Sequence, residues 1–159
     1  MRTHADTSAL IALLYPDDEH NERAAALLGD AAAEGRVAIS PITYAELAPD
    51  FGDREDLDAF VDDTGIAIDA PGRDALFAAG AAFQRYLDDR GDRLDCPACG
   101  ASGVSLDCPD CGEAIAPRQH PPSDFLIGAQ AERDADRLLT FDAGFFRRSF
   151  DVEVVGIAE

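Results

Sequence analysis

Four carboxylates stand where an ionised group is costly. Asp6 follows a short apolar segment at the start of the chain, and Asp142 follows the apolar run 138–141. Glu46 and Asp124 lie in two segments of helical apolar spacing, TYAEL and SDFLIGAQAE. A carboxylate in apolar surroundings needs a partner or a metal ion, because it has lost the solvation of water. We therefore predict that these four acids converge on a divalent cation.

The chemistry that such a site supports is phosphodiester cleavage. Carboxylate oxygens suit Mg²⁺ or Mn²⁺, hard ions that keep several of their waters. An ion of this kind lowers the pKa of a bound water and neutralises charge on a scissile phosphate. Three hydroxyl groups close to the acids in sequence could hydrogen-bond to the ion's water shell, those of Thr7, Ser8 and Thr140. No side chain is assigned as a general base.

Each acid also has a simpler interpretation when it is taken alone. Asp6 could cap the helix that follows it, and Glu46 could be an exposed helix residue. Asp124 could complement the dipole of its own helix, and Asp142 could form a turn before Ala-Gly. The combination of all four, in this order along the chain, favours the metal site.

The four cysteines form a second candidate metal site. Cys96, Cys99, Cys108 and Cys111 make two CPxCG pairs, and four thiolates at this spacing suit tetrahedral structural Zn²⁺. Two disulfides or a redox use of CxxC are the alternatives, and we expect a cytoplasmic protein, where disulfides are rare. We interpret the nearby His120 as an ordinary loop residue, because four thiolates fill the zinc shell. The predicted zinc-binding insert covers residues 92–119 and braces a loop or mediates an interaction.

The elements that must position these residues alternate between strand and helix. Short apolar segments predict strands at 2–6, 37–40, 66–68, 138–141 and 152–157. Helical spacing predicts helices at 7–15, 19–34, from Pro41, at 53–63, 71–89, 123–134 with Ser123 as its cap, and a turn or short helix at 143–150. The pattern predicts an α/β fold, a three-layer αβα sandwich with a central parallel sheet of about five strands. We expect a single domain over residues 1–159.

Parallel sheets bind ligands outside the carboxyl ends of their strands, where the strand order reverses. Asp6 and Asp142 each follow a predicted strand. If those two strands are neighbours, both carboxylates project into one crevice.

The charge composition indicates a protein adapted to high salt. The formal net charge is −19, and all 13 basic residues are arginines. Scattered acidity of this size is typical of a surface adapted to high salt, which screens self-repulsion; an acidic protein with biased codon usage is the alternative. No apolar stretch is long enough to span a membrane, and the apolar start lacks a cleavage site, so we interpret it as mature structure.

Four motifs, ADTSALIALL, YAEL, SDFLIGAQAE and LLTFDAGF, resemble those of PIN-domain ribonucleases, especially the VapC-like toxin branch. The resemblance covers nearly the whole chain except residues 91–119. It implies that Asp6, Glu46, Asp124 and Asp142 are the family's acidic quartet and that Thr140 is its T-x-D hydroxyl. Ser8 stands where Asn is common in the family. The implied activity is Mg²⁺- or Mn²⁺-dependent cleavage of RNA.

The expected function is therefore a metal-dependent endoribonuclease, the toxin of a toxin–antitoxin pair, with a protein antitoxin as partner and a homodimeric state. Arg147 and Arg148 are the candidate RNA contacts, whereas Phe145 and Phe146 are expected in the core more than in base stacking. Two alternatives stay open, a housekeeping RNA-processing nuclease of the same fold and a non-catalytic zinc-ribbon binding module. An aspartyl-phosphate phosphohydrolase is disfavoured, because the chain lacks the second acid of D-x-D and any lysine.

Overall fold

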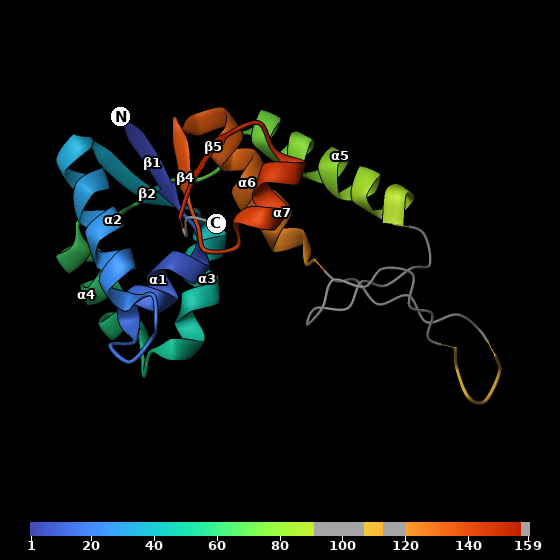
Figure 1. Ribbon diagram of the computed structural model, residues 1–159, viewed down its shortest axis with the longest axis horizontal. Coiled ribbons are helices and arrows are strands. Elements are labelled where there is room, and N and C mark those ends of the chain that lie inside the picture. Colours follow the sequence, from blue (N-terminus) through green and yellow to red (C-terminus); the bar gives the residue numbers. More distant parts are fainter. Residues whose placement is uncertain (91–106, 113–119, 157–159) are drawn as a thin grey trace.

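A computed structural model describes residues 1–90, 107–112 and 120–156 (Figure 1). Its centre is a five-stranded sheet in the order β3-β2-β1-β4-β5, in which all four strand pairs are parallel. The strands are β1 (Arg2–Ala5), β2 (Arg36–Ile39), β3 (Ala67–Ile68), β4 (Arg137–Leu139) and β5 (Glu153–Val155). The order reverses between β1 and β4, which pair directly, so the two strands that precede Asp6 and Asp142 are neighbours, as the sequence-based expectation of one shared crevice requires.

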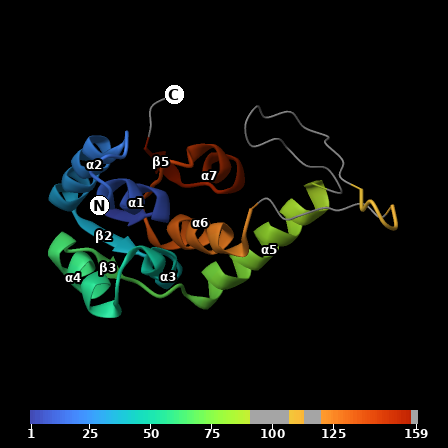
Figure 2. The ribbon, with the colours of Figure 1, turned by 90° about the horizontal axis from the view of Figure 1, so that it is seen from below.

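Helices cover both faces of this sheet, which confirms the three-layer α/β prediction. They are α1 (Thr7–Leu14), α2 (Asn21–Glu34), α3 (Pro41–Leu47), the 3₁₀ turn η1 (Ala48–Asp50), α4 (Arg54–Thr64), α5 (Arg73–Arg90), α6 (Pro122–Asp134) and α7 (Ala143–Ser149). In Figures 1 and 2, α1, α2 and α4 gather on one side of the strands, and α5, α6 and α7 on the other.

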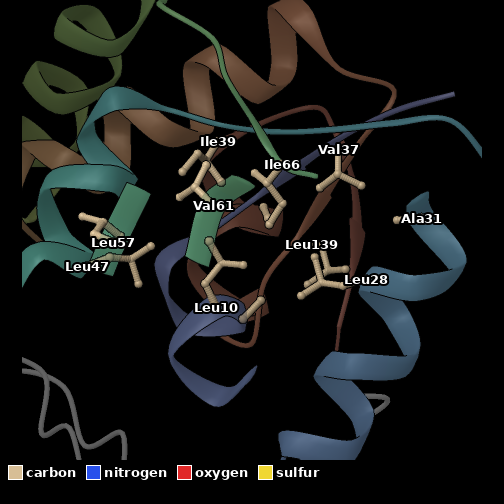
Figure 3. Packing of buried hydrophobic residues seen from close by; sticks show 12 residues of the cluster. Leu10, Leu28, Ala31, Val37, Ile39, Leu47, Leu57, Val61, Ile66 and Leu139 are labelled. Atoms are coloured by element: carbon tan, nitrogen blue, oxygen red, sulfur yellow. The ribbon is translucent and has the colours of Figure 1, made fainter. Parts of the chain in front are cut away.

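Two hydrophobic cores lie on the two faces of the sheet. Successive residues of β4 point to opposite faces, because side chains alternate along a strand. Leu139 joins the core formed with α1, α2 and α4, whose apolar side chains meet in Figure 3. Leu138 joins the core formed with α5, α6 and α7. Both cores therefore hold β4 in place, and with it the chain that leads to Asp142.

The second core is built largely from aromatic rings. Phe145 and Phe146 are 3% and 2% exposed, which confirms their prediction as core residues. Gly128 of α6 lets α6 and the ring of Phe150 approach closely, since an added Cβ would overlap that ring. This packing fixes the start of α7, where Asp142 lies, against the start of α6, where Asp124 lies.

The observed elements depart from the predicted ones in two places that affect the site. Ser123 was the predicted cap of α6, and this is wrong: the N-cap residue is Pro121, with no side-chain cap hydrogen bond. Proline needs no partner for a backbone N–H in the first turn, so Pro122 begins the helix. Strand β4 ends at Leu139 rather than at 141, and Asp142 stands at the N-cap of α7.

Cys96 and Cys99 lie outside the described residues, as does most of the predicted 92–119 insert. Among the helices that are described, none has the length and apolar character needed to cross a bilayer.

Candidate functional site

Asp6 is the most buried of the four predicted acids. It follows β1 and is the N-cap of α1, and its side chain accepts hydrogen bonds from the backbone N–H and Oγ of Ser8, at 3.4 and 2.7 Å. Its own N–H donates to the carbonyl of Leu139 at 2.9 Å, which extends the β1–β4 pairing up to the site. Asp6 is therefore both a helix cap and a member of the predicted cluster.

Burial raises the pKa of Asp6 above its usual value, although hydrogen bonds from Ser8 and Thr140 oppose the shift. The residue is only 6% exposed. A carboxylate in this position is destabilised by lost hydration and is stabilised by a nearby cation.

The hydroxyl of Thr140 links two of the acids. Its Oγ1 donates to Oδ2 of Asp6 at 2.8 Å and accepts from the backbone N–H of Asp142 at 3.0 Å. The hydroxyl of Ser8 accepts from the N–H of Phe141 at 3.0 Å. These two hydroxyls hold the segment between β4 and α7 against the end of β1.

The carboxylate of Asp142 is exposed and makes no capping hydrogen bond, although the residue occupies the N-cap position of α7. The carboxylate is therefore not used to cap the helix.

Glu46 reaches the same region from α3. Ser40 caps this helix, and Pro41 follows at its first position, so its start is well defined. The hydroxyl of Thr7, in the first turn of α1, donates to Oε2 of Glu46. Glu46 is half-buried rather than fully exposed, and its carboxylate has a fixed partner.

Asp124 lies in the first turn of α6, with its side chain 24% exposed. Its pKa is raised to about 7, first by burial and then by the negative charges of Asp6, Glu46 and Asp142. The repulsion reaches Asp124 from three separate elements, so the four predicted acids share one electrostatic environment. Such crowding of like charge is typical of functional sites.

His120 belongs to the site, although the sequence alone indicated an ordinary loop residue. Its Nδ1 lies 3.5 Å from Oδ2 of Asp124, and its ring stacks on Phe145 at a centroid distance of 4.3 Å. The available signal was its spacing, since His120 stands four residues before Asp124 and just ahead of a helix.

The chemistry of the donor set fits a hard divalent cation, but the oxygens are not gathered around a single point. Within residues 1–90, 107–112 and 120–156, no three His, Cys, Asp or Glu side chains form a ready-made metal-binding group. Asp6 and Glu46 each have one carboxylate oxygen held by a hydroxyl, and Asp124 is repelled by the other acids. A cation would reverse that repulsion and pull the oxygens inward.

The remaining predicted residues are the two arginines of α7 and the cysteines, which are only partly described. Arg147 and Arg148 are exposed in the last turn of α7, and Arg148 is close enough to lower the pKa of His120. Cys108 and Cys111 occur in the described segment 107–112 as free cysteines.

The sequence of the chain matches one known family. The sequence model described as the PIN domain matches residues 5–151. No curated protein matches the chain.

Several solved structures share the fold at low sequence identity. VapBC-1 from nontypeable Haemophilus influenzae is 17% identical with a TM-score of 0.63, covering 98% of each chain. VapBC2 from Rickettsia felis, bound to a DNA fragment from its promoter, is 18% identical with a TM-score of 0.61, covering 99% of this chain and 100% of that one. VapC20 from Mycobacterium tuberculosis, a toxin that cleaves the sarcin–ricin loop, is 16% identical with a TM-score of 0.53, covering 94% and 96%.

Proposed function

The chain belongs to the PIN-domain family, and from this premise we propose that it is a Mg²⁺- or Mn²⁺-dependent endoribonuclease, the toxin of a toxin–antitoxin pair. The observation that carries the proposal is the convergence of the four acids. Thr140 joins Asp6 to the backbone of Asp142, and burial together with the charges of Asp6, Glu46 and Asp142 raises the pKa of Asp124 to about 7. A cation site built from four carboxylates is expected to show this mutual repulsion, because only a bound cation balances their negative charge.

The residues of the site would act by binding and orientation. Asp6, Glu46, Asp124 and Asp142 would hold the divalent cation, which supplies positive charge to the scissile phosphate and activates a water. Ser8 and Thr140 fix the carboxylate of Asp6, and Thr7 fixes that of Glu46, so two ligands enter the reaction already oriented. Orientation of this kind lowers the entropic part of the barrier.

RNA would approach across the exposed end of α7. Arg147 and Arg148 are exposed there, and Arg148 influences His120, which in turn contacts Asp124. An arginine in this position would hold a phosphate beside the acids. The buried rings of Phe145 and Phe146 stabilise the core and are not offered for base stacking.

The proposed partner is a protein antitoxin. Two solved structures that share this chain's fold over nearly its full length, VapBC-1 and VapBC2, carry the name VapBC. A protein partner that neutralises the site would be expected to present basic groups to four carboxylates. A cytoplasmic location is part of the same proposal, because the RNA substrate is inside the cell.

Cleavage of total cellular RNA in multimolar KCl with Mn²⁺ tests the activity, with mapping of the new ends. Asp6→Asn and Asp142→Asn should each lose at least about 100-fold in cleavage rate, as expected when a charge-stabilising group is removed. Circular dichroism should show both variants folded. Cleavage by either variant at the wild-type rate would refute the assignment, and wild-type protein that neither cleaves RNA nor binds Mn²⁺ would favour a non-catalytic binding module.

We also propose a homodimer formed through the outer face of α5. A groove of about 390 Å³ runs between α5, α6 and the end of α7, with Phe77 and Phe150 among its apolar lining. Phe77 is 81% exposed, an unusual state for a large apolar side chain. The groove's charged residues are balanced, namely Asp74, Glu132, Arg85 and Arg133. On a chain of net charge −19, a balanced patch is where a second copy meets least repulsion.

Analytical ultracentrifugation tests this interface. Phe77→Ser should convert the dimer to a monomer, because it removes the main exposed apolar group of the groove. Leu76→Ser is the matched control, since Leu76 is also exposed on α5, at 46%, but does not line the groove. A wild-type monomer, or a Phe77→Ser dimer of unchanged affinity, would contradict the proposal.

Structural zinc is proposed for the four cysteines. The support comes from Cys108 and Cys111, the two that the structure describes. Backbone N–H groups of Asp110 and Cys111 point at the Cys108 sulfur and lower the pKa of its thiol. Gly112, at φ 74°, donates its N–H to the Cys108 carbonyl at 2.9 Å. A turn that stabilises a thiolate suits a metal ligand. Metal analysis of purified protein should find about one zinc per chain, and Cys108→Ser should lose it; zinc-free wild-type protein would contradict this.

Adaptation to high salt is proposed from composition alone. Because the net charge is −19, screening of self-repulsion should raise the melting temperature as KCl increases from about 0.1 M, where the Debye length is about 10 Å, to 1 M, where it is about 3 Å. A melting temperature that stays constant or falls over this range would contradict the adaptation.

A further inference from the structure

His120 is the one described histidine in contact with a member of the acidic quartet, and the proposed reaction gives it no role. Its Nδ1 lies 3.5 Å from Oδ2 of Asp124, and the two side chains are 28% and 24% exposed. The charges of Asp142 and Arg148 also act on its imidazole. His120 therefore contacts one proposed cation ligand and is influenced by the charges of a second ligand and of a proposed phosphate contact.

The imidazole of His120 is held by rigid aromatic neighbours. It stacks on Phe145 with ring centroids 4.3 Å apart and an interplanar angle of 24°, and it meets the ring of Tyr86 edge-on at 5.6 Å. Phe145 is itself buried in the core shared by α5, α6 and α7. A ring fixed on two sides presents its Nδ1 in one direction, toward Asp124.

Two other proposed cation ligands, Asp6 and Glu46, are each held by a polar side chain. Asp6 is held by Ser8 and Thr140, and Glu46 is held by Thr7. In the described part of the chain, the side-chain contact that reaches Asp124 comes from His120. Without it, an acid repelled by three others would turn toward solvent, since α6 begins at the surface.

We propose that His120 is a positioning residue, whose Nδ1–H holds the Asp124 carboxylate in the orientation that binds the divalent cation. The inference rests on the proposed metal centre and extends it to the group that orients one ligand. Contacts of this kind typically change metal affinity or activity by about 10–100-fold when they are removed.

Calorimetric titration of the full chain with Mn²⁺ tests the role, because it reads the site without requiring turnover. His120→Ala should raise the Mn²⁺ dissociation constant by about 10-fold or more. His120→Asn should recover most of that loss, because the Asn amide can donate from nearly the position of Nδ1. His20→Ala is the matched control, since His20 pairs with Glu19 and packs on Phe141, and it should bind Mn²⁺ as the wild type does.

The outcomes separate this inference from the proposed function. If Asp6→Asn does not weaken Mn²⁺ binding, the metal centre itself is refuted. If Asp6→Asn abolishes binding but a folded His120→Ala binds Mn²⁺ like wild type, only the positioning role is refuted. A His120→Ala variant with unchanged Mn²⁺ affinity but slower cleavage would place His120 on the substrate instead, and this too overturns the inference. A loss of Mn²⁺ affinity in His120→Ala that His120→Asn largely restores, with both variants folded, supports it.

Discussion

The two halves of the acidic site are built differently. The sheet half consists of Asp6 with the hydroxyls of Ser8 and Thr140, at the adjoining ends of β1 and β4. The helix half consists of Asp124 and Asp142, at the starts of α6 and α7. The first is buried and closed by hydrogen bonds, whereas the second is partly exposed, and its Asp124 is repelled by Asp6 and Glu46 as well as by Asp142.

The two halves are therefore positioned by different kinds of interaction. The sheet half is organised before a cation arrives, because backbone pairing and two hydroxyls fix it. In the helix half, the described contact on Asp124 comes from His120, and the carboxylate of Asp142 is exposed without a capping hydrogen bond.

The largest expected effect comes from removing one acidic charge from each half of the site. Asp6→Asn and Asp124→Asn should each lower the cleavage rate by at least about 100-fold, and the double variant should lose little more, because groups that act together are not additive. Single-turnover cleavage of a mapped RNA site measures this. Independent, multiplying losses would show that the two halves do not serve the same cation.

Removing the hydroxyl that joins the halves should come next. Thr140→Val removes one of the donors to Asp6, which keeps those of Ser8, and leaves the Asp142 N–H without its acceptor. This should cost about 1–3 kcal/mol of unfolding free energy. Thr43→Val is the matched control, because Thr43 is fully buried and its hydroxyl has no partner among the described residues. Urea denaturation compares the two, and an equal cost for both variants would contradict the special role of Thr140.

Asp124, in the helix half, should make the stability of the protein depend on pH. The pKa of Asp124 is raised from 3.8 to about 7, so the folded state binds more protons than the unfolded chain between these values. Stability from this group therefore falls as pH rises from about 4 to 7.

Metal-free Asp124→Asn should accordingly be more stable than wild type at pH 8, by about 1 kcal/mol or more. That advantage should shrink as the pH falls toward 4, where wild-type Asp124 is protonated. Thermal melts with chelator across this range measure it, and an advantage that is constant with pH would contradict the raised pKa.

The smallest effect concerns the proposed RNA contact. Arg148→Gln should raise KM severalfold and reduce the salt dependence of binding by about one phosphate contact, with little change in kcat. An unchanged salt slope would remove Arg148 from the RNA-binding surface.

The approach of Asp6 to Asp142, across the two halves, could be predicted from sequence. Apolar runs that end in Asp6 and near Asp142 define buried strands followed by acids, and parallel sheets bring such strand ends to one edge. The pairing of β1 with β4 then made the two positions adjacent. Local pattern and a general rule of topology were sufficient.

The helix half could not be predicted in the same detail. The contact of His120 with Asp124 depends on the stack of its ring on Phe145, from an element distant in sequence. The raised pKa of Asp124 depends on charges from three other elements. The wrong cap at Ser123 has a different, local origin, because Pro122, one residue earlier, begins the helix.

The most direct test of the central claim is a crystal structure of the protein grown with Mn²⁺, measured at a wavelength that reveals manganese. The account predicts an anomalous peak within about 2.0–2.6 Å of carboxylate oxygens from both halves, Asp6 on one side and Asp124 or Asp142 on the other. A peak elsewhere on this acidic surface, such as at Asp17 and Asp18, with none at the quartet, would contradict it.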